Sequence, residues 1–141
     1  MRKPYCLMLW VFVVVAACVF AQGPRTIQAD ITYTGSGTVN ASHKIYVALW
    51  DSADFDSGPP AATRALDSKR GTVTFMDVRK VPAYVSTAYD PTGAWDAQSP
   101  PPRGSSLGVY SLHPPAPAPV DVAPGKTAKV KITFDDSVKA P

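Results

Sequence analysis

Proline is the residue that most restricts what this chain can fold into. Fourteen of the 15 prolines follow residue 21, and each removes a backbone N–H donor that a helix interior or a central strand would use. All 11 acidic residues are aspartate, which is unfavourable inside helices and common in turns. No stretch after residue 21 shows an apolar stripe with helical spacing. The sequence therefore predicts an all-β domain with turn-rich connections.

Seven short segments have the composition or the alternation of β-strands. In residues 26–33 and 127–134, apolar and polar residues alternate, as in a strand with one buried face. Residues 43–50 are mostly apolar on both sides and predict a central strand. Together the segments predict a seven-stranded, two-sheet antiparallel β-sandwich, immunoglobulin-like or prealbumin-like. The predicted strands are 26–33, 43–50, 62–66, 71–78, 81–89, 108–112 and 127–134.

Proline and glycine also predict the connections between these strands. The sequence HPPAPAP, residues 113–119, predicts an extended polyproline-type segment, because prolines in series cannot pair inside a sheet. Residues 90–108 predict a long irregular loop. The β-sandwich is expected to span residues 22–136 and to end in a flexible tail, residues 137–141.

Residues 1–21 have the organisation of a secretory signal peptide. A basic start, MRKPY, precedes an uncharged run from Cys6 to Ala21 that is short for a membrane span. Cleavage after Ala21 predicts an exported protein, periplasmic or extracellular. The sequence VAAC, residues 15–18, also resembles a bacterial lipobox. Processing there would leave Cys18 lipidated and the protein anchored to the membrane.

The composition of the mature chain argues against several classes of function. Cleavage removes Arg2 and Lys3, so 14 − 2 = 12 basic residues face 11 acidic ones, and a net charge of +1 predicts no nucleic-acid partner. Both cysteines lie in the signal peptide, which leaves no thiol nucleophile and no disulfide in the released domain. His43 and His113 have no nucleophile motif beside them. We therefore expect a protein that is not an enzyme and has no resident cofactor.

The segment YDPTGAWD, residues 89–96, has two interpretations. Asp90, Thr92 and Asp96 stand at positions 1, 3 and 7 of an oxygen-ligand loop that would suit Ca²⁺. An EF-hand loop also needs glycine at position 6 and glutamate at position 12, whereas Trp95 occupies position 6 and the chain has no glutamate. DPTG is equally the sequence that a type I turn prefers. Calcium binding is therefore an alternative to a simple turn.

Aromatic residues flank two of the predicted loops. Trp50 and Phe55 flank the loop after the central strand, and Tyr89 and Trp95 flank the long loop that begins at residue 90. If both loops lie at one end of the sandwich, these four residues would form a ligand-binding face of the kind that sugar-binding modules use. The alternative is that Trp95 folds back and closes the core.

The order of strands and turns resembles the prealbumin-like β-sandwich domains of small secreted bacterial proteins, which include the carboxypeptidase regulatory-like domains. Gly71, Val73 and Phe75 match the G-x-F-x-F pattern of a strand in that group. The P-x-G-x-Y-x-V link that follows is matched loosely at Pro82 and Tyr84, without its glycine. The resemblance implies a β-sandwich that is a non-catalytic module.

These observations predict an exported, non-catalytic protein of the cell envelope that acts as a small binding module. The expected partner is a protein or a glycan of the envelope. Two alternatives are a carbohydrate-binding module that uses Trp50 and Trp95, and a structural domain stabilised by Ca²⁺. A membrane is expected as a partner only if Cys18 is lipidated.

Overall fold

Seven strands are present, one for each predicted segment, and four of them have bounds other than those predicted. The structure is a computed structural model that describes residues 23–141, so the predicted signal peptide, its cleavage site at Ala21 and Cys18 lie outside the described residues. The described residues contain no helix, and hence none that could cross a membrane. The strands are β1 (Thr26–Tyr33), β2 (Ile45–Trp50), β3 (Ala62–Leu66), β4 (Arg70–Phe75), β5 (Tyr84–Tyr89), β6 (Ser106–Val109) and β7 (Thr127–Phe134).

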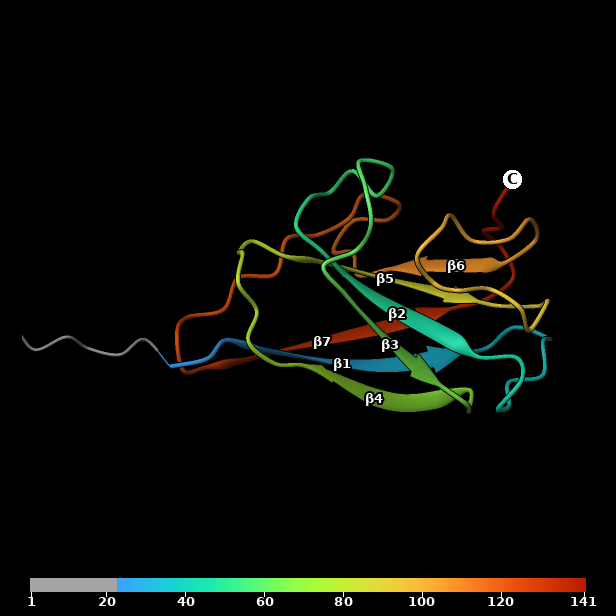
Figure 1. The fold of residues 1–141 in the computed structure, drawn as a ribbon, viewed down its shortest axis with the longest axis horizontal. Helices are drawn as coiled ribbons and strands as arrows, with labels where there is room; N and C mark the ends of the chain where they lie inside the picture. The colour runs from blue at the N-terminus through green and yellow to red at the C-terminus, as the bar shows by residue number, and fades with distance from the viewer. Residues whose placement is uncertain (1–22) are drawn as a thin grey trace, which may run out of the picture.

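Two sheets face each other across one apolar core. The three-stranded sheet has the order β4-β1-β7, and the four-stranded sheet has the order β3-β2-β5-β6 (Figure 1). Alternate residues of each strand point inward, which is why the apolar positions of β1 and β7 are buried while their polar neighbours are not. The largest fully buried apolar side chains come from both sheets and are Phe75, Ile27, Ile31, Ile45, Ile132, Val47 and Val85.

The prediction of a purely antiparallel sandwich is wrong at one pair of strands. β1 and β7 run parallel, in register from Thr26 opposite Thr127 to Tyr33 opposite Phe134. Both strands begin at the same end of the molecule, where the Gly125 amide donates to the Gly23 carbonyl at 3.0 Å. Parallel pairing is possible because β1 and β7 lie far apart in the chain, so no hairpin sets their relative direction.

The proline-rich segment 113–119 does not run as an extended polyproline helix. The Ala116 amide donates to the His113 carbonyl at 3.2 Å, and the Ala118 amide donates to the Tyr110 carbonyl at 2.8 Å. These bonds close a tight hairpin after β6. They form because the alanines between the prolines keep the backbone N–H groups that the prolines lack.

The predicted flexible tail, residues 137–141, is instead paired with the free edge of β6. The Leu107 amide donates to the Val138 carbonyl at 2.9 Å, and the Ala140 amide donates to the Ser105 carbonyl at the same distance. Ala140 is buried. An edge strand as short as β6 carries unpaired backbone groups, and the C-terminal segment satisfies them.

Candidate functional site

The two aromatic loops lie at opposite ends of β2, so the expectation that they share one end is wrong. Trp50 ends β2, and its ring stands 5.0 Å from that of Phe55, centroid to centroid. Tyr89 ends β5, and it pairs with Ile45 at the beginning of β2. Since β2 and β5 are antiparallel neighbours, the loops that follow them must leave from opposite ends.

Tyr89 belongs to the core and not to a ligand-binding surface. Its ring is 7% exposed and stacks on Tyr33 at a centroid distance of 5.1 Å. Its hydroxyl donates to the Thr38 carbonyl at 3.0 Å. Burial, together with the nearby negative charge of Asp90, raises the pKa of Tyr89. The residue is inward-facing because Tyr89 continues the inward row of β5 that contains Val85.

Trp95 neither closes the core nor projects into solvent. Its indole is half-buried and packs edge-on against Tyr46, with ring centroids 5.1 Å apart. The indole N–H donates to the Ser99 carbonyl at 3.0 Å, which fixes the ring's orientation. Tyr46 lies in the outward row of β2, so Trp95 covers the outer face of the four-stranded sheet.

The outer face of the four-stranded sheet carries a row of aromatic side chains, which we call the aromatic face. Tyr46 and Trp50 both point outward from β2 and lie about 13 Å apart along the strand. Trp50 also pairs with the outward-facing Tyr84 of β5, and its indole N–H donates to the Ser86 hydroxyl at 2.8 Å. All five members are half-buried, and they are Tyr46, Trp50, Phe55, Tyr84 and Trp95.

The carboxylate of Asp90 forms hydrogen bonds within the turn that follows β5. Its carboxylate is 1% exposed and accepts hydrogen bonds from the Thr92 amide at 2.8 Å, the Thr92 hydroxyl at 2.6 Å and the Trp95 amide at 3.1 Å. Burial alone would raise the pKa of Asp90, but the hydrogen bonds outweigh it and lower the pKa. Thr92 therefore acts as a donor to Asp90, as a turn requires.

Asp96 organises a separate, exposed turn. One of its carboxylate oxygens accepts hydrogen bonds from the Gln98 amide at 2.9 Å, the Ser99 amide at 3.0 Å and the Ser99 hydroxyl at 2.7 Å. The bonds from Ser99 and Gln98 lower the pKa of Asp96 to about 2. In residues 23–141, no group of three or more His, Cys, Asp or Glu side chains is arranged to hold a metal ion.

Calcium should therefore have little effect on the stability of this domain. A ligand that binds only the folded state raises the melting temperature once its free concentration exceeds its dissociation constant, and the rise grows with the logarithm of the concentration. Since both oxygens of Asp90 already accept hydrogen bonds from the chain, we expect the melting temperature to stay constant up to millimolar Ca²⁺. Magnesium is the control for ionic strength. A rise with Ca²⁺ that is lost in Asp90→Asn would contradict this expectation and support the calcium alternative.

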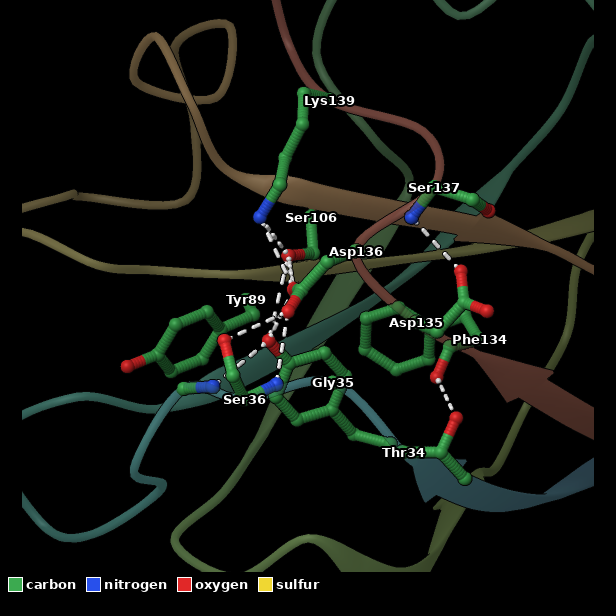
Figure 2. A network of polar contacts seen from close by, with 12 residues as sticks. Thr34, Gly35, Ser36, Tyr89, Ser106, Phe134, Asp135, Asp136, Ser137 and Lys139 are labelled. Carbon is green, nitrogen blue, oxygen red and sulfur yellow. Dashed lines mark hydrogen bonds and ion pairs between the residues drawn. The ribbon is translucent and has the colours of Figure 1, made fainter.

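A second polar cluster, the polar latch, joins the two sheets beside the C-terminal segment (Figure 2). One carboxylate oxygen of Asp136 accepts hydrogen bonds from the Tyr33 hydroxyl at 2.6 Å, the Ser106 hydroxyl at 2.6 Å and the Lys139 ammonium at 3.0 Å. The other oxygen accepts from the amide and the hydroxyl of Ser36, at 2.8 and 2.9 Å. The polar latch therefore consists of Tyr33, Ser36, Ser106, Asp136 and Lys139.

The charge of Asp136 is strongly stabilised inside the polar latch. Hydrogen bonds from Ser106, Tyr33, Ser36 and Lys139 hold the pKa of Asp136 well below its usual range. Burial and the hydrogen bond to Asp136 raise the pKa of Tyr33. Sequence reasoning missed this cluster. Tyr33 and Asp136 are 103 residues apart, and only the sheet arrangement brings them together.

The polar latch holds Ser, Lys, Tyr and Asp side chains within hydrogen-bond reach, as some hydrolytic sites do. A serine nucleophile must give its proton to a base, but Ser106 donates to Asp136, whose lowered pKa makes it a weak base. Ser106 is also fully buried, with no exposed surface for a substrate to reach. The arrangement supports a structural role, in which the polar latch fastens the C-terminal segment to β1 and β6.

Comparison of the chain with family models, with curated proteins and with solved structures finds no match in any of the three. The fold defines an all-β, two-sheet, sandwich-like domain, and the aromatic face is its candidate binding surface. Sequence reasoning named Trp50, Phe55 and Trp95 but missed Tyr46 and Tyr84. Both tyrosines alternate with buried residues in strands of the four-stranded sheet, and that alternation was the signal that could have found them.

Proposed function

We propose that this chain is a non-catalytic, exported module of the cell envelope that binds its partner through the aromatic face. The observation that carries the proposal is the row of half-exposed rings on one sheet face, held in place by neighbouring side chains. Trp50 is fixed by Ser86 and Phe55, and Trp95 is fixed by Tyr46. Rings that are already immobilised lose little entropy on binding, and aromatic residues dominate the energetics of protein interfaces.

Two features of the sequence support the rest of the proposal. The charge and apolar pattern of residues 1–21 supports export. The resemblance to prealbumin-like sandwich domains supports a non-catalytic module, and the two sheets agree with that resemblance. A fold alone transfers no binding site, so the partner must be sought through the aromatic face itself. Mass spectrometry of the mature N-terminus distinguishes release after Ala21 from lipidation at Cys18.

Removing two rings from the aromatic face should weaken partner binding strongly. We expect a component of the native envelope that is retained by the wild-type protein to bind the Tyr46→Ala/Trp50→Ala variant at least tenfold more weakly, because truncating a hot-spot ring costs about 2 kcal/mol or more. The measurement is the dissociation constant of the captured component by surface plasmon resonance. Met76→Ala is the control, because Met76 is 66% exposed and follows β4 of the other sheet.

Circular dichroism and the melting temperature must show that the variant remains folded. Equal affinity of the wild-type protein and the folded variant for every captured component would contradict the proposed surface. Loss of affinity in Met76→Ala as well would place the binding surface elsewhere.

A carbohydrate is the second candidate partner, and the spacing of the rings favours it. The Tyr46–Trp95 pair and the Trp50–Phe55 pair lie about 13 Å apart along β2, with the small residues Ala48 and Ser86 between them. An extended glycan could stack on both pairs at once. Electrophoresis through gels that contain a neutral soluble polysaccharide tests this idea. Slower migration of the wild type that is reduced in both Trp50→Ala and Trp95→Ala would favour a glycan partner. Migration at the normal rate in every gel would contradict a glycan partner.

A further inference from the structure

The outer face of the three-stranded sheet is polar throughout and differs sharply from the aromatic face. The strands β4, β1 and β7 lie side by side (Figure 1). The side chains of this face come from their outward rows, which lie in register across the sheet. Gln28, for example, lies between Thr74 and Lys129. We call this surface the basic face, and its members are Thr26, Gln28, Asp30, Thr32, Arg70, Thr72, Thr74, Thr127, Lys129, Lys131 and Thr133.

The basic face carries a net positive charge that the domain does not neutralise. Arg70, Lys129 and Lys131 are exposed, and they face a single carboxylate, Asp30, so the face carries 3 − 1 = +2. Asp30 already accepts a hydrogen bond from the Thr72 hydroxyl at 2.6 Å. In the described part of the chain the only ion pair is Lys139–Asp136, so none of the three cations is held in an ion pair, although Lys131 is the cross-strand neighbour of Asp30.

The three cations are spread over a flat surface and do not converge on a pocket. Lys129 and Lys131 are separated by about 6.7 Å along β7. Arg70 lies two strands away, about 10 Å across the sheet, and it is level with Thr133, so it is also offset along the strands from both lysines. Between Arg70 on β4 and the lysines on β7 lies the outward row of β1, with the polar side chains Gln28, Asp30 and Thr32. Charges at this spacing suit a polymer that repeats its anionic groups, because each group can reach a different cation.

We propose that the basic face binds an anionic polysaccharide, independently of the partner at the aromatic face. Charge complementarity selects the anion, and the rows of threonine hydroxyls supply hydrogen-bond partners for sugar hydroxyl groups. The outward rows of β1, β4 and β7 contain no apolar side chain that could enter a lipid bilayer. Because the two faces belong to different sheets, both partners can be bound at the same time.

The test uses polygalacturonate, a carboxylate-bearing polysaccharide, with neutral dextran as its control. At low ionic strength we expect the Lys129→Gln/Lys131→Gln variant to bind polygalacturonate roughly five- to tenfold more weakly than wild type, with a smaller salt dependence. Lys80→Gln/Arg103→Gln removes the same charge from exposed loop positions outside the basic face and should bind as wild type does. The Tyr46→Ala/Trp50→Ala variant should also retain binding, which separates this proposal from the proposed function.

Several results would overturn the proposal. One is an equal loss of affinity in the Lys80→Gln/Arg103→Gln variant, which would show that binding depends on the net charge of the domain and not on the basic face. Another is binding to vesicles of phosphatidylglycerol without binding to polygalacturonate, which would make the partner a membrane. A third is unchanged affinity in Lys129→Gln/Lys131→Gln. If the lysines only protect the edge of β7 from pairing with other chains, that variant would self-associate in size-exclusion chromatography without losing affinity for the polysaccharide.

Discussion

Replacing Asp136 by alanine should lower the free energy of unfolding by about 2–4 kcal/mol, which is a large part of the stability of a domain of this size. The substitution removes an acceptor of five hydrogen bonds and leaves the buried hydroxyls of Tyr33 and Ser106 without their charged partner. It also releases Lys139, which helps to hold the C-terminal segment on β6. Urea unfolding monitored by tryptophan fluorescence measures this change in the free energy of unfolding.

The neighbouring residue provides a matched control for this prediction. Asp135 is exposed and accepts a hydrogen bond from the Ser137 amide at 2.8 Å, outside the polar latch. We expect Asp135→Ala to leave the free energy of unfolding almost unchanged. Tyr33→Phe, which removes one donor to Asp136 and keeps the ring, should cost about 1–2 kcal/mol. Equal effects of Asp135→Ala and Asp136→Ala would contradict a special role for the polar latch.

Acid should destabilise the wild-type domain more than the Asp136→Ala variant. The pKa of Asp136 is lower in the folded state than in the unfolded chain, where an aspartate titrates near ~3.9. Its contribution is therefore fully present above about pH 4–5 and is lost as the pH falls below that range. Asp90 and Asp96, whose pKa values are also lowered, act in the same direction in both proteins.

The measurements are the free energy of unfolding and the melting temperature of both proteins at pH 6, 5 and 3. We expect the melting temperature of the wild type to fall by on the order of 10 °C between pH 6 and pH 3, and that of Asp136→Ala to fall less. The difference between the two stability curves should shrink as the pH falls, because the unfolded wild-type chain takes up a proton at Asp136 that the folded state does not. Parallel curves across the whole range would show that Asp136 does not carry the pH dependence.

Local patterns in the sequence were enough to predict the strands. The alternation in 26–33 and 127–134 and the turn residues between segments placed β1, β3 and β7 at their observed bounds. β5 begins at Tyr84, later than predicted, because Pro82 has no N–H to donate to a neighbouring strand. β6 spans Ser106–Val109, whereas the sequence predicted a strand at 108–112. The beginning of β6 is hydrogen-bonded to the C-terminal segment, and local patterns do not reveal that pairing.

The candidate site could be predicted only in part, since its members depend on pairing between distant segments. Trp50 and Trp95 could be named as candidate residues from the sequence, but Trp95 meets Tyr46 only because the loop after β5 folds back over the sheet. No local feature of the sequence indicates whether β7 runs parallel or antiparallel to β1. The polar latch depends on that direction, because parallel pairing brings Tyr33 and Phe134 side by side and places Asp136 next to the end of β1.

The parallel pairing of β1 and β7 also determines how the domain would be oriented if it were attached to a surface through its N-terminus. Gly23, the first residue that the structure describes, meets Gly125 at one end of the molecule, and β1 runs from there toward the opposite end (Figure 1). The eight residues of β1 span about 26 Å. A tether there would hold the strands upright and carry the polar latch at the distal end. The broad outer faces of both sheets would then point sideways, away from the surface of attachment, where neighbouring polymers or proteins can approach them.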